Sequence, residues 1–339
     1  SLDPKVVNLY LENMTLTSSD INNLYNFFKK TGSSYNSTYG VDQGGITNLC
    51  IYTLNGKEYS YREARDMINN AKENGYILPR FKKQATKEYF DLKNKLISRG
   101  LTNNQASIIL SSIDDVGACS YAAKANSIFY KFSNNPKLFE KTFGFPMYKI
   151  NANGEMLLNS NELLLDMYLF ANDTANGGRL FSKNYDGSYS FSTDNRIDVF
   201  GRPMLNTNNQ VFMSNSNGSN NSTLSSYLSS KGLDWSSYNL ITNLPNNVLS
   251  STEFNGYIEA VKNSINDGKS VQLNIFSKGN EIRMINKNPA FSCTTKSWGE
   301  GGGHAIFITG MNNQGFIVSS WGREYLIPFS DLQNGGYFN

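Results

Sequence analysis

Two residues of this chain have the chemistry of a nucleophilic enzyme: Cys119 and His304, the only histidine among 339 residues. A thiolate that attacks an amide carbonyl needs a group that afterwards protonates the departing amine, and imidazole has a suitable pKa near neutral pH. A lone cysteine or a lone histidine is more often a packing residue, but here each supplies what the other's chemistry lacks. The sequence therefore predicts acyl transfer by a Cys119–His304 pair.

Cys119 stands at the beginning of an expected helix. Gly117 and Ala118 come just before it and leave the approach to the sulfur open. After it, apolar residues recur at helical spacing: Tyr121, Ala125, Ile128, Phe129 and Phe132. The first turn of a helix presents free N–H groups and the positive end of the helix dipole, and this setting favours a thiolate.

His304 follows three glycines at the start of an apolar run, in the stretch GEGGGHAIFITG. Because they carry no side chain, Gly302 and Gly303 would leave room for the backbone of a substrate, so we expect both to line the binding site. Trp298 and Trp321 each precede a glycine, one before and one after His304 along the chain. We expect both indoles at the substrate site, with Trp321 shielding the imidazole.

The C-terminal part of the chain shows the elements that would position the histidine. A helix is expected over 251–267, capped by Ser251 or Thr252, and strands over 270–276, 304–311 and 316–321. The turn NNQG joins the last two strands as a hairpin. This order predicts an α+β fold with an antiparallel sheet.

Residues 1–100 are expected to be mostly helical and to act as a scaffold or a partner-binding region. A helix is expected to begin at 17–20, and others over 61–72 and 85–98. Residues 145–250 mix strand-like and loop segments, and the polar stretch 214–226 is typical of a surface loop.

Three motifs, GACSYAA at a helix start, GGHAIFITG and FIVSSWG, together resemble the papain-like cysteine peptidase superfamily, including its C39-like and YopT-type bacterial branches. The resemblance covers roughly residue 101 to the C terminus. It implies a helical lobe with the nucleophile, packed against an antiparallel sheet with the histidine. The distance between Cys119 and His304 along the chain exceeds the usual spacing, which implies insertions within 145–250. The expected domains are therefore a helical region at 1–100 and a papain-like catalytic domain at 101–339.

The sequence departs from the family pattern in two places. The third residue of the family's triad, an Asn or Asp, falls on Ser319, with Ser320 as the one-residue alternative; a serine carries no charge to stabilise an imidazolium. The nearest later carboxylate is Asp331. The glutamine that donates to the oxyanion is replaced by Ile113, and the polar residues that could help instead are Asn103, Asn104 and Gln105.

Composition excludes several other classes of protein. The net charge is +3 and no run of Lys or Arg stands out, which argues against nucleic-acid binding. No apolar run is long enough to span a bilayer, and the first residues lack a signal peptide's features. One His and three scattered cysteines give no common zinc motif, and no phosphate loop or calcium loop appears, so no cofactor or metal is expected. Cys50 and Cys293 lack the setting of Cys119, and the sequence leaves open whether any disulfide forms.

These features predict a cysteine peptidase with a protein substrate, and they leave open whether that substrate belongs to a host. The alternatives are a glutamine or asparagine deamidase with the same pair, an inactive papain-like binding protein, and an adhesin with an incidental cysteine. The Asn-, Ser- and Tyr-rich composition suits an exported bacterial virulence factor or toxin, secreted or delivered into a host cell. The oligomeric state stays open.

Overall fold

The computed structural model of the chain describes residues 27–28, 39–115, 117–150, 154–192, 194–213, 224–233, 250–299, 301–334 and 336–338. They form two compact units, each assembled from separate stretches of sequence. The first unit holds the described residues of Ser1–Asp42, Cys119–Ser160 and Tyr238–Asn339, and the second those of Gln43–Ala118 and Asn161–Ser237. The chain therefore does not divide near residue 100. Part of the second unit comes from the stretch 145–250, where insertions were expected.

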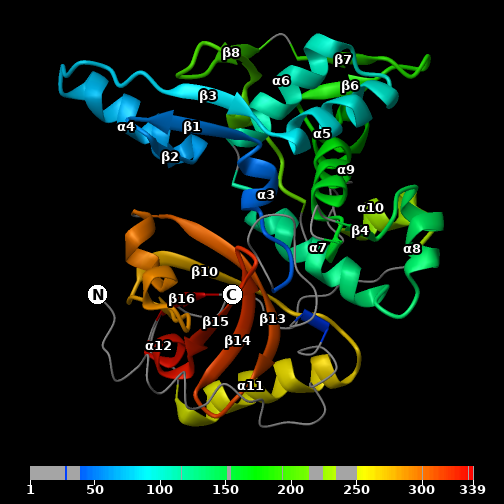
Figure 1. Cartoon of the computed structure of the whole chain (residues 1–339). Helices are drawn as coiled ribbons and strands as arrows, with labels where there is room; N and C mark the ends of the chain where they lie inside the picture. The colour runs from blue at the N-terminus through cyan, green and yellow to red at the C-terminus, as the bar shows by residue number, and fades with distance from the viewer. Residues whose placement is uncertain are drawn as a thin grey trace. The chain divides into compact units, whose positions relative to one another are not determined.

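A five-stranded antiparallel sheet forms the centre of the first unit, in the order β15-β14-β13-β10-β16 (Figure 1). The expected antiparallel sheet is thus confirmed, and the hairpin at NNQG joins β13 to β14. The sequences of β13 and β14 are nearly continuous apolar runs because both faces of the sheet are covered. The strands are β10 (Gln272–Gly279), β13 (Gly303–Met311), β14 (Gly315–Ser320), β15 (Arg323–Pro328) and β16 (Gly336–Phe338).

Helix α11 (Ser251–Asn266) covers one face of this sheet (Figure 1). Its Tyr257 ring lies 6.0 Å from the Phe316 ring of β14. Since side chains alternate along a strand, the strand pairings then assign residues to the two faces. The α11 face carries Leu273, Ile275, His304, Ile306, Ile308, Phe316, Val318 and Ser320. The opposite face carries Gln272, Asn274, Ala305, Phe307 and Ser319.

Helix α7 (Cys119–Lys131) covers that opposite face, which we call the α7 face. The Lys124 Nζ atom donates to the Gln272 Oε1 atom at 3.3 Å, and Ser127 hydrogen-bonds Ser270 just before β10. The earlier residue of α7, Lys124, thus contacts the later residue, Gln272, so α7 and β10 run antiparallel. The first unit thus has three layers, with α7 and α11 on either side of the sheet.

Helix α11 begins at Ser251, but its N-cap is one residue earlier than expected. Ser250, rather than Ser251 or Thr252, is the N-cap: its hydroxyl accepts from the Glu253 N–H, and the Glu253 carboxylate accepts from the Ser250 N–H. This reciprocal capping box satisfies two N–H groups that would otherwise lack partners. The remaining elements of the first unit are α8 (Pro136–Phe143), β4 (Tyr148–Ile150), β5 (Met156–Leu158), β11 (Arg283–Met284), β12 (Cys293–Thr294) and α12 (Phe329–Gln333).

In the described part of the first hundred residues, a small sheet accompanies the expected helices. A three-stranded antiparallel sheet, ordered β2-β1-β3, is formed by β1 (Cys50–Leu54), β2 (Lys57–Tyr59) and β3 (Lys82–Ala85). Asn55 and Gly56 join β1 to β2 with φ of 51° and 77°, the positive values of a hairpin turn that Asn-Gly favours. The Asn-Gly signal was in the sequence, but the strands beside it are too short for a clear alternating pattern.

The predicted helices of the second unit are largely confirmed. The expected helix over 61–72 is α4 (Tyr61–Glu73), and that over 85–98 is α5 (Lys87–Ser98), which starts after its cap Thr86 because Ala85 ends β3. The expected helix start at 17–20 lies outside the described residues, as does most of 214–226. The other elements are α3 (Gly44–Thr47), α6 (Asn103–Asp114), α9 (Ser160–Asn172), β6 (Phe181–Lys183), β7 (Tyr189–Phe191), β8 (Asn195–Ile197), β9 (Pro203–Leu205) and α10 (Leu224–Ser230).

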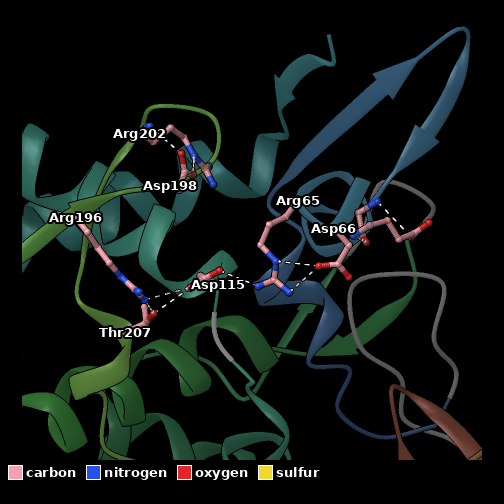
Figure 2. A network of polar contacts seen from close by, with 9 residues as sticks. Arg65, Asp66, Asp115, Arg196, Asp198, Arg202 and Thr207 are labelled. Atoms are coloured by element: carbon pink, nitrogen blue, oxygen red, sulfur yellow. Dashed lines mark hydrogen bonds and ion pairs between the residues drawn. The ribbon is translucent and has the colours of Figure 1, made fainter. Parts of the chain in front are cut away.

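Two neighbouring aspartates at the end of α6 hold the second unit together through arginines. Asp115 accepts from Arg65 of α4 at 2.9 Å and lies 3.6 Å from the Arg196 guanidinium of β8 (Figure 2). Asp114 accepts from Arg202 at 3.0 Å, and the same guanidinium donates to Asp198 at 2.6 Å. Burial raises the pKa of Asp114 to about 7, even beside this cation.

Replacing Arg202 by methionine is expected to destabilise the second unit by about 3 kcal/mol. The substitution leaves Asp114 and Asp198, whose side chains are 2% and 1% exposed, without their shared cation. Urea unfolding measures the effect. The matched control is Lys87→Met, which removes a cation from an exposed pair with Asp91 and is expected to leave the unfolding midpoint unchanged. Equal behaviour of the two variants would contradict the role given to Arg202.

Among the helices of the described residues, none has both the length and the apolar character needed to cross a membrane.

Candidate active site

Helix α7 begins at Cys119, as predicted. The thiol is free and half-buried, at the end of the helix where backbone N–H groups lack intrahelical partners. The helix is anchored by the apolar residues that the sequence pattern identified, all buried: Tyr121, Ala125, Ile128, Phe129 and Phe132. The Phe129 ring also stacks on Phe139 of α8 at 5.4 Å. The first turn around Cys119 is therefore held in place by the packing of the rest of α7.

Lys124 is a functional candidate that the sequence analysis missed. It is 3% exposed, and its Nζ atom bonds the neutral side chain of Gln272. In the described part of the chain it forms no ion pair with a carboxylate. Burial lowers the pKa of Lys124 to about 8, and the negative charge available to Cys119 opposes that shift. A lysine within the apolar pattern of α7 was the available signal.

Replacing Lys124 by methionine is expected to slow alkylation of Cys119 by iodoacetamide at neutral pH, by roughly threefold to tenfold. Methionine keeps most of the volume of the lysine side chain but removes the positive charge, and a nearby cation in general favours the reactive thiolate form of a cysteine. Mass spectrometry of the Cys119 peptide over time gives the rate. Lys137→Met, on the exposed surface of α8, is the matched control. Unchanged alkylation in Lys124→Met would show that this cation does not act on the thiol.

His304 is held by three neighbours on the α11 face. Its Nε2 atom lies 2.5 Å from the Ser320 hydroxyl oxygen. The Trp321 ring stacks on the imidazole with centroids 4.3 Å apart and 10° between planes, and Trp298 meets it edge-on at 5.4 Å. The Nδ1 atom forms no hydrogen bond within the described residues. Burial at 7% exposure lowers the pKa of His304 to about 3, so the ring is neutral at physiological pH.

Ser319 is not the partner of His304. Its hydroxyl lies on the α7 face and donates to the Tyr39 carbonyl at 3.0 Å. Consecutive residues of a strand point to opposite faces, so Ser320, the one-residue alternative, takes the position beside the imidazole. Asp331 is also excluded, because its carboxylate is bound at 2.7 and 2.8 Å by the guanidinium of the arginine that opens β11.

Cys119 and His304 lie at a similar level along the sheet but on opposite faces of it. Ser127 of α7 hydrogen-bonds Ser270, just before β10. Cys119 precedes Ser127 in the same helix, and the rise of an α-helix places it about 12 Å from Ser127 along the helix axis. The same distance along β10, at about 3.3 Å per residue from Ser270, reaches Asn274. Asn274 is next to Ile275, which pairs with His304 on the neighbouring strand. No hydrogen bond joins the sulfur to the imidazole in this structure. The two residues of the sequence-predicted pair thus lie on opposite faces of the sheet, with no hydrogen bond between them.

Gly302 and Gly303 serve close packing instead of leaving space for a substrate. A Cβ atom on Gly302 would lie 3.1 Å from both the Cβ atom and the carbonyl oxygen of Trp298, and one on Gly303 would lie 3.0 Å from the Phe276 ring. The expectation that these glycines open the site is therefore wrong for this conformation. Trp298 and Trp321 do lie beside the imidazole, as expected for Trp321.

The residues considered as oxyanion donors belong to the second unit. Ile113 is buried within α6, and Asn103 and Asn104 are exposed in its first turn. Gln105 completes the capping box of α6 and donates to the Tyr189 carbonyl at 2.7 Å. The backbone N–H of Cys119, the donor that the family pattern also implies, lies in the first unit at the start of α7.

The other two cysteines are chemically distinct from Cys119. All three are free, so the question of a disulfide is settled for the described residues. Burial raises the pKa of both Cys50 and Cys293 to about 11, which keeps them as thiols at neutral pH.

No family model matches the sequence, and comparison with curated proteins and with solved structures returned no significant match. Within the described residues, no group of three or more His, Cys, Asp or Glu side chains is arranged to hold a metal ion.

Proposed function

We propose that the protein is a papain-like cysteine hydrolase that cleaves amide bonds, with Cys119 as nucleophile and His304 as general base and acid. The observation that carries the proposal is the environment of His304. Its Nε2 atom is bonded to Ser320 and its ring is covered by Trp321, while Nδ1 forms no bond among the described residues. With Nε2 fixed, Nδ1 is the nitrogen that can accept the thiol proton. Burial lowers the pKa of the ring to about 3, below the value ideal for a base at neutral pH, so the proposal requires the imidazole to become more basic when substrate binds.

In the proposed reaction the Cys119 sulfur attacks the carbonyl carbon of the substrate, and its proton passes to Nδ1 of His304. The carbon–nitrogen bond then breaks, and the imidazolium returns this proton to the departing amine. Water, deprotonated by Nδ1, attacks the thioester; the carbon–sulfur bond breaks, and the sulfur regains a proton. The ring must therefore carry its resting proton on Nε2, which donates to the Ser320 oxygen.

The proposal requires the sulfur and Nδ1 to meet in the reacting complex, which calls for a rearrangement of the site because the two residues lie on opposite faces of the sheet in this structure. Ser320 supplies orientation but no negative charge, so it stabilises an imidazolium less than an aspartate would. Lys124, on the same helix, is a buried cation whose charge interacts with that of Cys119.

The same chemistry serves a peptidase, in which a peptide amine leaves, and a deamidase, in which ammonia leaves. We favour a peptidase acting on a protein, since the second unit adds a large body that a small substrate would not require. An exported bacterial virulence factor or toxin, secreted or delivered into a host cell, suits this activity and the composition.

A non-catalytic papain-like binding protein is the second candidate. It is favoured by two observations: no hydrogen bond joins the sulfur to the imidazole, and the third position holds an uncharged serine. In that case Cys119 and His304 would be packing residues of an inherited fold.

Selective alkylation separates the two candidates. The wild-type chain is treated with iodoacetamide at neutral pH, and modification of Cys119, Cys50 and Cys293 is followed by mass spectrometry. The hydrolase predicts fast modification of Cys119 alone, slowed in His304→Gln, together with labelling of Cys119 by an epoxysuccinyl peptide probe. Similar slow modification of all three thiols, with no effect of His304→Gln, would support the binding protein.

A further inference from the structure

Loop 75–81 of the second unit, the connection between α4 and β3 (Figure 1), holds three consecutive large apolar side chains in solvent. Tyr76, Ile77 and Leu78 are 66%, 97% and 44% exposed. We call these three residues the apolar tip. Single exposed apolar residues are common on proteins, but a contiguous group marks a surface that another body covers.

The fold itself holds the apolar tip in this position. At one end, Gly75 has a φ of 66° and closes α4: the Tyr76 N–H donates to the Ala71 carbonyl at 2.9 Å, and the Gly75 N–H donates to the Lys72 carbonyl at 3.3 Å. These two bonds form the usual C-terminal capping pattern of a helix. The exposure is therefore not the result of a frayed helix end.

At the other end of the loop, Phe81 is fixed in an aromatic cluster. Its ring lies 5.7 Å from Tyr59 of β2 and 6.3 Å from Phe200. Five residues thus remain between the cap at Gly75 and the anchor at Phe81. Phe81 is thus partly buried in this cluster, whereas the apolar tip lies in solvent.

Unpaired positive charges flank the apolar tip. Lys72, Arg80 and Lys82 are exposed, and none of them forms an ion pair within the part of the chain that the structure describes. Glu73 is the single acidic residue between positions 72 and 83. Apolar side chains at a tip with cations behind them match an anionic bilayer surface, where the tip enters the headgroup boundary and the cations meet lipid phosphates and carboxylates.

We propose that loop 75–81 docks the protein on an anionic membrane surface by inserting Tyr76, Ile77 and Leu78 at the lipid interface. A protein partner is the less suitable occupant, because a stable interface buries about 800 Å² on each side and three side chains supply well under that area. The inference is independent of the proposed hydrolase activity, since docking requires neither Cys119 nor His304.

Vesicle sedimentation with the full chain tests this proposal. The probes are vesicles of phosphatidylcholine alone and vesicles that also contain phosphatidylserine. The wild-type chain is expected to bind the second kind, and added salt is expected to weaken binding. Ile77→Asp is expected to weaken it at least roughly tenfold, and Arg80→Gln roughly fivefold. The matched control is Ile197→Asp, at a 69% exposed position of β8, which is expected to bind like the wild type.

The proposal is overturned if the wild-type chain sediments with neither kind of vesicle, or if Ile77→Asp and Ile197→Asp bind equally well. It is also overturned if light scattering shows a dimer that Ile77→Asp abolishes while vesicles are not bound, since a second copy would then cover the apolar tip. Circular dichroism checks that both variants are folded, as expected for substitutions at exposed positions.

Discussion

Replacing Cys119 by alanine is expected to abolish amide hydrolysis, with a loss of about a thousandfold or more. The alanine removes the one sulfur that lies at a helix start, half-buried and beside a cation without a carboxylate partner. The other two thiols cannot substitute for it, because burial raises their pKa to about 11. Release of fluorescent peptides from a labelled protein substrate measures the loss.

Two further variants give this experiment its controls. Cys293→Ala removes a thiol of the same unit and is expected to leave turnover unchanged. The double variant Cys119→Ala/His304→Ala is expected to be no worse than either single variant, because residues that act as one catalytic group lose their effect together. Losses that add in the double variant would mean that the two residues act separately.

Acid is expected to destabilise the first unit through His304. Burial lowers the pKa of this imidazole to about 3, whereas an unfolded histidine titrates near about 6.5. Between these values the unfolded chain binds a proton that the folded chain does not, so stability falls as pH falls. The shift corresponds to a loss on the order of 4 kcal/mol by about pH 3. The stabilising effect of the neutral, buried ring is complete above about pH 6.5.

The comparison that isolates this effect is wild type against His304→Gln, by urea unfolding at several pH values. Other groups titrate in the same range: burial raises the pKa of Asp114 to about 7, and that carboxyl favours folding as pH falls. Asp114 is present in both chains, so its effect cancels in the difference between them. The advantage of the wild type over His304→Gln is expected to shrink by about 1.4 kcal/mol per pH unit below about 6.5. Parallel curves would mean that the imidazole titrates as an exposed histidine.

The sequence predicted the strongest local patterns correctly. The helix that begins at Cys119, the helix after Ser250 and the strands around His304 all follow from apolar periodicity and caps. The short strands β1 to β3 were missed, since elements of three to five residues show too little alternation. The two units were missed as well, because their boundaries depend on contacts between residues far apart along the chain.

The details of the candidate site depended on geometry that spacing alone does not give. Ser319 and Ser320 differ by one residue, and the register of β13 with β14 decides which one faces the imidazole. This register shifts between Ile308 and Gly310, and no pattern in the sequence predicts the irregularity. Lys124 was overlooked because a single lysine within an apolar helix pattern is usually assigned to solvent. Gly302 and Gly303 were interpreted as open space, whereas the side chains of Trp298 and Phe276 fill it.

The most direct test of the Cys119–His304 pair uses the fact that the chain has one histidine. A sample labelled with nitrogen-15 in histidine gives one pair of imidazole signals, which can be recorded before and after alkylation of Cys119. A functional pair predicts a neutral ring protonated on Nε2, and an Nδ1 signal that moves when the sulfur is alkylated. Signals that stay in place after complete alkylation would contradict the pairing on which the proposed function rests.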